Sequence, residues 1–236
     1  MKSSVNAPVK EKIRMEIDKL REMTFKEKIE YIWEYYKYHI IGLAIFVFVL
    51  VSLLNFWVFN PNPDEALFIS WNAGFATDEQ IDDLTSFLEE RLIDEDVNEK
   101  VVIAQYFYNS DDPTVFMANV QRTVAMIAAG VIDLFVLDMQ LLEEYSDIGY
   151  LQPLDNILTE VRLKNPEVFS RIEENIIYTL CDTGEGIKER RVTGVKIGNS
   201  PLFSNLGMFE QELFLGVSIT AGKMDNIVKT FIMFFE

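Results

Sequence analysis

The sequence is poor in the two side chains on which much enzyme and metal chemistry depends. It has one cysteine, Cys181, and one histidine, His39, in 236 residues. A single cysteine excludes an internal disulfide, and with it the disulfide-stapled class of secreted domains. Because His39 lies at the start of a long apolar run, the chain beyond it has no histidine for a Ser-His or Cys-His mechanism or for a histidine metal site.

Motifs for nucleophilic catalysis, phosphate binding and calcium binding are also missing. The sequence contains no Gly-x-Ser-x-Gly, Ser-x-x-Lys or Gly-x-x-x-x-Gly-Lys pattern. Residues from Asp94 begin like a calcium loop, but Glu99 and Gln105 stand where that loop needs glycine and glutamate. Nothing singles out a carboxylate pair for glycoside hydrolysis. We therefore expect a protein that is not an enzyme and binds no metal or cofactor.

Basic residues are few relative to acidic ones. The chain has 21 Lys and Arg against 38 Asp and Glu, a formal net charge of −17. This balance makes nucleic acid and anionic lipid surfaces poor partners for the molecule as a whole. The excess lies after residue 38, where 12 basic and 31 acidic residues give −19. A solvated acidic surface explains this charge, and attraction of a cationic partner is the alternative.

Charge is absent altogether from residues 38–63, which have an apolar centre at 40–59. About 20 residues at a rise of about 1.5 Å each cover about 30 Å, the hydrocarbon thickness of a bilayer. An uncharged core helix of this length is rare in a soluble protein. Residues 55–61 offer no small-x-small site for signal cleavage. The sequence therefore predicts an uncleaved transmembrane anchor at 39–60.

The flanks of this anchor predict its orientation. Residues 1–38 hold nine Lys and Arg, whereas no basic residue follows the apolar run until Arg91. By the positive-inside rule the N-terminus is cytoplasmic and the rest is extracellular, in a single-pass cell-membrane protein whose first partner is the lipid bilayer. Aromatic residues flank both edges of the run, as in interfacial belts: Tyr31, Trp33, Tyr35, Tyr36 and Tyr38, then Phe56, Trp57 and Phe59.

The cytoplasmic segment, residues 1–38, contains a helix-start signal. The run Thr24-Phe25-Lys26-Glu27 matches a capping box, which predicts a helix that begins at Thr24 and continues into the membrane helix. Its apolar residues recur at spacings of three and four, which suits an amphipathic helix at the headgroup level. A docking helix for a cytoplasmic or membrane partner is the alternative, and we favour the anchoring interpretation.

The remaining residues, 64–236, alternate between strand-like and helix-like patterns after a Pro-containing spacer. Alternation of this kind predicts a single α/β domain with a mostly parallel mixed sheet and helices on both faces. The expected strands are 66–71, 101–108, 131–137, 192–197 and 213–219. The expected helices are 77–93, 112–129, 141–145, 154–161, 166–177 and 223–235.

One stretch carries a resemblance to a known family. Residues 130–138 give a small residue, Asp133 and an apolar run, and Gly149-Tyr150-Leu151 and Pro153-Leu154-Asp155 follow. This order resembles type 2 extracellular solute-binding proteins, and the segments 194–202 and 212–232 are similar to the returning strands and final helix of that family. The resemblance covers about residues 66–236 and implies a bacterial source and the fold of one lobe of such a protein.

The chain departs from that family in length. Family members close two lobes over a solute, whereas residues 156–190 are too short to form a second lobe. Two functions follow. The first is a membrane-anchored, non-enzymatic interaction or assembly module with a protein partner in or outside the membrane. The second is a tethered solute-binding module that captures a small molecule or peptide for a transporter. The missing lobe favours the first.

Polar residues at the strand ends are the candidate ligand-binding site. The carboxyl ends of parallel strands share one edge of a sheet, where open α/β sheets bind ligands. A simpler interpretation is that these side chains only cap helices and form turns, and it needs no ligand. Cys181, within a polar stretch, could be an exposed thiol but has no resolving partner. The candidate site residues are Asn72, Gly74, Asn109, Ser110, Asp111 and Asp138.

Overall fold

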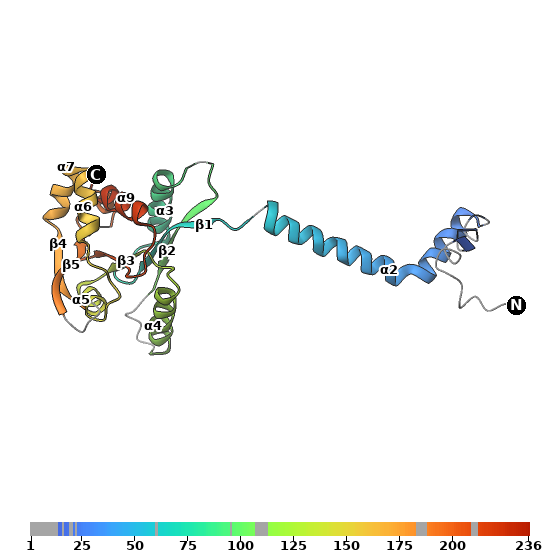
Figure 1. Ribbon diagram of the computed structural model, residues 1–236, viewed down its shortest axis with the longest axis horizontal. Coiled ribbons are helices and arrows are strands. Elements are labelled where there is room, and N and C mark those ends of the chain that lie inside the picture. Colours follow the sequence, from blue (N-terminus) through green and yellow to red (C-terminus); the bar gives the residue numbers. More distant parts are fainter. Residues whose placement is uncertain are drawn as a thin grey trace. The chain divides into compact units, whose positions relative to one another are not determined.

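The computed structural model divides the chain into two units, Met1–Asn62 and Pro63–Glu236 (Figure 1). Each is described here by itself. The structure describes residues 14, 15, 17, 18, 21, 23–59, 61–94, 96–106, 113–182, 188–208 and 212–236.

The first unit contains one long helix, α2 (Phe25–Leu54), which continues as a π-helical turn, η2 (Asn55–Phe59). The expected capping box at Thr24 is confirmed. The backbone N–H and the hydroxyl of Thr24 both donate to Glu27 Oε2, each at 2.8 Å. These two hydrogen bonds hold the pKa of the Glu27 carboxyl below its usual value. The helix therefore begins where the sequence predicts and runs without a break into the apolar segment.

Residues Trp33–Trp57 form a helical stretch of 25 residues that is long and apolar enough to cross a membrane. None of it is buried against the described part of the chain. Large apolar side chains of this stretch, such as Phe48, which is 75% exposed, are therefore mostly exposed. A helix that is apolar all round and uncovered needs an apolar environment outside the protein.

The second unit is built on one six-stranded sheet in the order β2-β1-β3-β6-β5-β4. Most helices lie near the positions that the sequence predicts, and α8 is an additional one. The strands are β1 (Asp64–Trp71), β2 (Glu99–Gln105), β3 (Leu134–Leu137), β4 (Ile176–Asp182), β5 (Lys188–Lys196) and β6 (Phe214–Val217). The helices are α3 (Asp78–Leu92), α4 (Pro113–Ala128), α5 (Met139–Asp147), α6 (Asp155–Lys164), α7 (Pro166–Glu173), α8 (Pro201–Asn205) and α9 (Met224–Phe235).

The sheet is mixed, but the expectation that it is mostly parallel was wrong. Strand β1 pairs in parallel with β2 and β3, whereas the β3–β6, β6–β5 and β5–β4 pairs are antiparallel. Between β4 and β5 the chain has only the residues from Asp182 to Lys188 in which to reverse. A parallel connection needs about a dozen residues or more, so these two strands can only form a hairpin.

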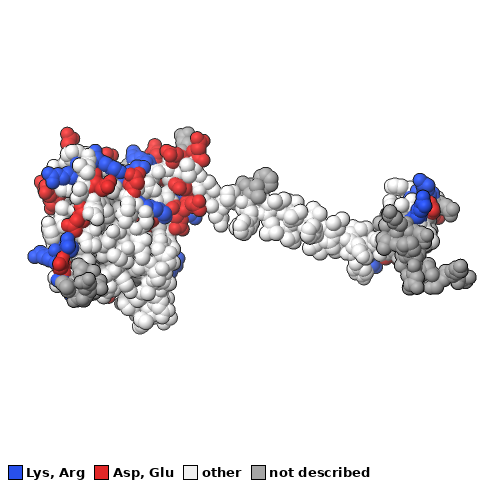
Figure 2. Space-filling model, in the orientation of Figure 1, with Lys and Arg blue, Asp and Glu red and all other residues white. Residues whose placement is uncertain are grey.

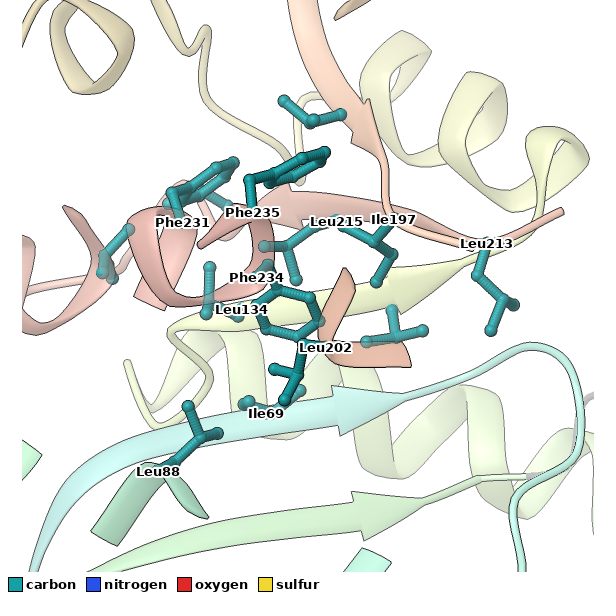
Figure 3. Close-up of a cluster of buried hydrophobic side chains, with 14 of the residues drawn as sticks. Ile69, Leu88, Leu134, Ile197, Leu202, Leu213, Leu215, Phe231, Phe234 and Phe235 are labelled. Atoms are coloured by element: carbon teal, nitrogen blue, oxygen red, sulfur yellow. The ribbon is translucent and has the colours of Figure 1, made fainter. Parts of the chain in front are cut away.

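Helices cover both faces of the sheet, as the sequence predicts, because the central strands alternate their side chains between two cores. On β1, Leu67 and Ile69 face a core that α3, α6, α7, α8 and α9 complete, and Phe68 faces a second core with α4 and α5. In the first core, Figure 3 shows phenylalanines of α9 among leucine and isoleucine side chains of the strands. The residues of this group are Phe231, Phe234, Phe235, Ile69, Leu134 and Leu215.

Strand β4 was not expected, because the predicted helix 166–177 was extended over its first residues. The helix α7 ends at Glu173. The strand buries Thr179 and Cys181 and exposes Tyr178 and Leu180, so its inward residues are the more polar ones. The Thr179 hydroxyl lies 2.6 Å from the Thr193 hydroxyl of β5, which satisfies both groups. Hydropathy alternation cannot detect a strand that buries hydroxyls and exposes apolar side chains.

A buried carboxylate, directly before β3, links β1 to the start of α9. Asp133, which is 1% exposed, accepts the backbone N–H of Phe68 at 2.9 Å and the ammonium group of Lys223 at 3.2 Å, both at Oδ2. Phe68 belongs to β1, and Lys223 directly precedes α9. Asp133 therefore has a structural role, because both groups that it binds belong to this chain.

Candidate functional site

A groove of about 200 Å³ lies between α4 and α5 in the second unit. Apolar side chains make up most of its wall, with a carboxylate at Asp138 and another at Glu144. Pockets of this kind, apolar with a few polar groups, are where proteins hold ligands and partner side chains. The groove is lined by Phe116, Val120, Thr123 and Val124 of α4 and by Asp138, Gln140, Leu141, Glu144, Tyr145, Ile148 and Tyr150 of and around α5.

Helix α5 is fixed firmly against the sheet. Asp138 follows β3 and caps the helix, because its Oδ1 accepts the backbone N–H of Leu141 at 2.8 Å. Below it, Leu142 is fully buried against Gly194 of β5. A Cβ at position 194 would lie only 2.8 Å from a Leu142 methyl group, so glycine is what allows this close approach. One wall of the groove is therefore rigid.

Helix α4 has few buried residues. It buries only Thr123 and Ile127 against the described chain, and Phe116 and Met117 are 40% and 52% exposed. Its one charged residue, Arg122, lies with its guanidinium 4.8 Å from the centre of the Tyr106 ring and does not line the groove. The opposite wall is therefore an apolar helix surface with little cover.

The surface around α4 is also poor in charge. Figure 2 shows charged side chains gathered over the α3, α6 and α7 side of the face in view, whereas the surface over α4 is nearly free of them. The exposed large apolar residues of α4, α5 and the turn that follows α5 are Val115, Phe116, Met117, Val124, Met139 and Ile148. Exposed large apolar side chains gathered on neighbouring elements are typical of an interaction site.

The structure brings only part of the predicted site to the groove. Asp138 lines it, as an N-cap whose second carboxylate oxygen has no partner among the described residues. Asn72 is buried instead: it accepts the Ser70 hydroxyl at 2.6 Å and donates to the Tyr145 hydroxyl at 3.3 Å. Asn72 therefore helps to position the Tyr145 side chain through this hydrogen bond. Gly74 lies in an exposed turn with φ of 72° and does not line the groove.

Three of the predicted site residues, Asn109, Ser110 and Asp111, lie outside the described residues, as does the predicted cap Asp112. Cys181 is buried, at 1% exposure, and its thiol lies 3.9 Å from the carbonyl oxygen of Leu151, so the alternative of an exposed thiol was wrong. No group of three or more His, Cys, Asp or Glu side chains among the described residues is arranged to hold a metal ion.

The charge of the groove is one-sided. Among the described residues that line it, Asp138 and Glu144 are charged and none is Lys or Arg. A second groove, between α6 and α9, contains Asp225, but that carboxylate already contacts Lys164 and Lys229. Hydrogen bonds from these two lysines lower the pKa of Asp225. In the α4–α5 groove, by contrast, neither acidic side chain forms an ion pair with a lysine or arginine among the described residues.

Sequence reasoning missed the α4 wall and Tyr145. The spacing of Phe116, Val120 and Val124 at four-residue intervals gives an apolar stripe on α4, but that stripe alone is read as a core-facing side. Only the three-dimensional structure shows that Phe116 and Val124 of this stripe are 40% and 42% exposed.

Comparisons with known proteins give little. No protein-family model matches the chain, and no curated protein matches it. One solved structure with a similar arrangement is an extracellular solute-binding protein family 1 from Alicyclobacillus acidocaldarius, at 12% identity and a TM-score of 0.31. The match covers 58% of this chain and 29% of that protein, so the chain spans less than a third of its length. At that score the likeness carries no argument about function.

Proposed function

We propose that the chain is a single-pass membrane protein whose second unit is a non-enzymatic interaction module outside the cell, with the α4–α5 groove as its contact surface. The observation that carries this proposal is the group of partly exposed apolar side chains on α4 beside the well-packed helix α5. A partner that covers this side would remove apolar surface from water, at about 25 cal/mol per Å².

The anchor supports the same proposal. The stretch Trp33–Trp57 has the length of a transmembrane helix, and the basic residues on its N-terminal side favour a cytoplasmic location for that side by the positive-inside rule. A module fixed to a membrane meets its partners at a high effective concentration, so a modest contact surface is enough for binding.

Site-specific photo-cross-linking in intact cells tests the interaction module. A photoreactive phenylalanine analogue at Met117, on the exposed side of α4, should give a discrete cross-linked protein band. The matched control is the same analogue at Leu163 on α6, which is 78% exposed and lies away from the groove. We expect no band from the control. Equal products from both positions, or none from either, would contradict the proposed contact surface.

Capture of a small solute is the second candidate, and the carboxylate of Asp138 in the wall of the groove favours it. A solute that binds only the folded state would stabilise it by about 2.7 kcal/mol at a hundredfold excess over its dissociation constant. At about 200 Å³ the groove is smaller than most ligand pockets. We therefore expect no large rise in melting temperature in a thermal-shift screen of amino acids, sugars and short acidic or neutral peptides on the full chain. A hit that is lost in Asp138→Asn, which preserves the cap, would establish solute capture instead.

A further inference from the structure

The α4–α5 groove has a shape and a charge that select one kind of partner. We propose that it holds an aromatic side chain of a peptide segment that carries basic residues beside that side chain. This inference rests on the proposed function and names the chemistry of the partner.

The size of the groove argues for a single large apolar side chain. A cavity of about 150 Å³ lined by apolar side chains is enough to hold a benzene ring. The α4–α5 groove has about 200 Å³, with Phe116, Val120 and Val124 on one wall and Leu141 and Ile148 on the other. A phenyl ring fills most of that volume, and the aliphatic side chains of both walls can pack against its faces.

The charge of the groove argues for basic neighbours of that aromatic residue. Glu144 is exposed on the rim and has no ion-pair or hydrogen-bond partner for its side chain among the described residues. Asp138 also lines the groove, and only one of its two carboxylate oxygens is used to cap α5 among the described residues. Two carboxylates without a nearby cation attract Lys or Arg, and they repel an acidic segment.

The same charges argue against the other occupants. In a complex of two copies of this chain, the acidic rim of one copy would face acidic residues of the other, because the part after residue 38 is strongly acidic. Like charges that face one another across an interface oppose association. An anionic lipid surface is repelled for the same reason. A basic, aromatic peptide is the occupant that satisfies both the apolar wall and the acidic rim.

The test uses the full chain in phosphatidylcholine nanodiscs, with ¹³C-labelled methionine methyl groups observed by NMR. Met117 and Met139 are adjacent in sequence to groove residues, and Met224 at the start of α9 reports on a remote site. The probes are three tripeptides, blocked at both ends: Lys-Phe-Lys, Lys-Ala-Lys and Glu-Phe-Glu.

We expect Lys-Phe-Lys to shift the Met117 and Met139 signals in a saturable way and to leave Met224 unchanged. Lys-Ala-Lys should bind about tenfold more weakly, because burial of a phenyl group contributes more than about 1.4 kcal/mol. Glu-Phe-Glu should bind more weakly still, because it is repelled by Asp138 and Glu144.

Variants separate the apolar and the charged parts of the site. The double change Asp138→Asn and Glu144→Gln should weaken Lys-Phe-Lys binding about fivefold and bring the Lys and Glu probes closer together, while Asn preserves the α5 cap. Glu160→Gln, in the α6–α9 groove, is the matched charge control and should change nothing. Val120→Trp fills the groove and should abolish binding, whereas Leu163→Trp on exposed α6 should not.

Three results would overturn the inference. They are equal binding of Lys-Phe-Lys and Glu-Phe-Glu, shifts at Met224 as large as those at Met117, and concentration-dependent shifts without any peptide, which would identify a second copy as the occupant. Failure of the peptides together with a cross-link from position 117 that Val120→Trp removes would reject the basic aromatic partner and leave the interaction module standing. Failure of both would reject the module as well.

Discussion

Protease added to intact cells should digest the part of the chain that follows Asn60 and leave the N-terminal segment whole. The expected effect is all-or-none, because the bilayer protects whichever side lies within the cell. The reason lies in charge asymmetry: residues 1–38 carry nine Lys and Arg, and none follows the apolar run until Arg91. Translocation of basic residues next to a membrane helix is disfavoured, so the basic flank stays inside.

This topology experiment is read with an epitope tag at each terminus. The C-terminal tag should disappear on protease treatment of intact cells, and the N-terminal tag should remain on a short fragment. Permeabilised cells provide the control, in which both tags are lost. A C-terminal tag that survives in intact cells and is lost only after permeabilisation would reverse the proposed orientation.

Replacement of Asp133 by alanine should lower the free energy of unfolding of the second unit by about 3 to 5 kcal/mol. The change removes the acceptor of the Phe68 backbone N–H and of the Lys223 ammonium group at a position that is 1% exposed. The partners left behind lose their hydrogen bonds, and Lys223 keeps a partly buried charge without its counter-ion. Domains are typically stable by about 5 to 15 kcal/mol, so this variant should be close to unfolding.

A surface ion pair provides the matched control for this stability prediction. Asp147 pairs with Lys188, and both side chains are about half exposed. Asp147→Ala should therefore cost no more than about 1 kcal/mol. Denaturant unfolding of the second unit can be followed by the fluorescence of Trp71, which is buried in that unit. The other two tryptophans, Trp33 and Trp57, lie at the ends of the apolar stretch and do not belong to this unit. Equal losses in both variants would show that Asp133 does not join the elements as described.

Local patterns in the sequence were sufficient for the elements that depend on neighbouring residues. The capping box at Thr24 predicts the start of α2, and the helix expected at 77–93 begins at a second capping box, formed by Thr77 and Gln80. Asp138 caps α5, as its position before an amphipathic run predicts. The apolar run needs only its length and its lack of charge to identify it as a helix that can span a bilayer.

Strand order could not be predicted from the same patterns. The parallel pairs β1–β2 and β1–β3 agree with the alternation of strands and helices. The sequence did not predict strand β4, because this strand buries Thr179 and exposes Leu180. Its hairpin with β5 makes that half of the sheet antiparallel. Pairing between strands distant in sequence depends on which strand edges are unpaired once the first strands have formed. The hydropathy pattern of a strand contains no information about this.

The candidate site shows the same division between sequence and tertiary structure. The sequence by itself determined that Asp138 ends a strand and starts a helix, that α4 has an apolar side, and that the apolar run can cross a membrane. Only the tertiary structure decided that Asn72 is buried beneath Tyr145 and that α4 leaves Phe116 exposed beside the rigid α5. The physical reason is that an apolar side chain has the same pattern in the sequence whether or not another element covers it. Burial is a property of what packs against a residue, and distant parts of the chain supply that neighbour.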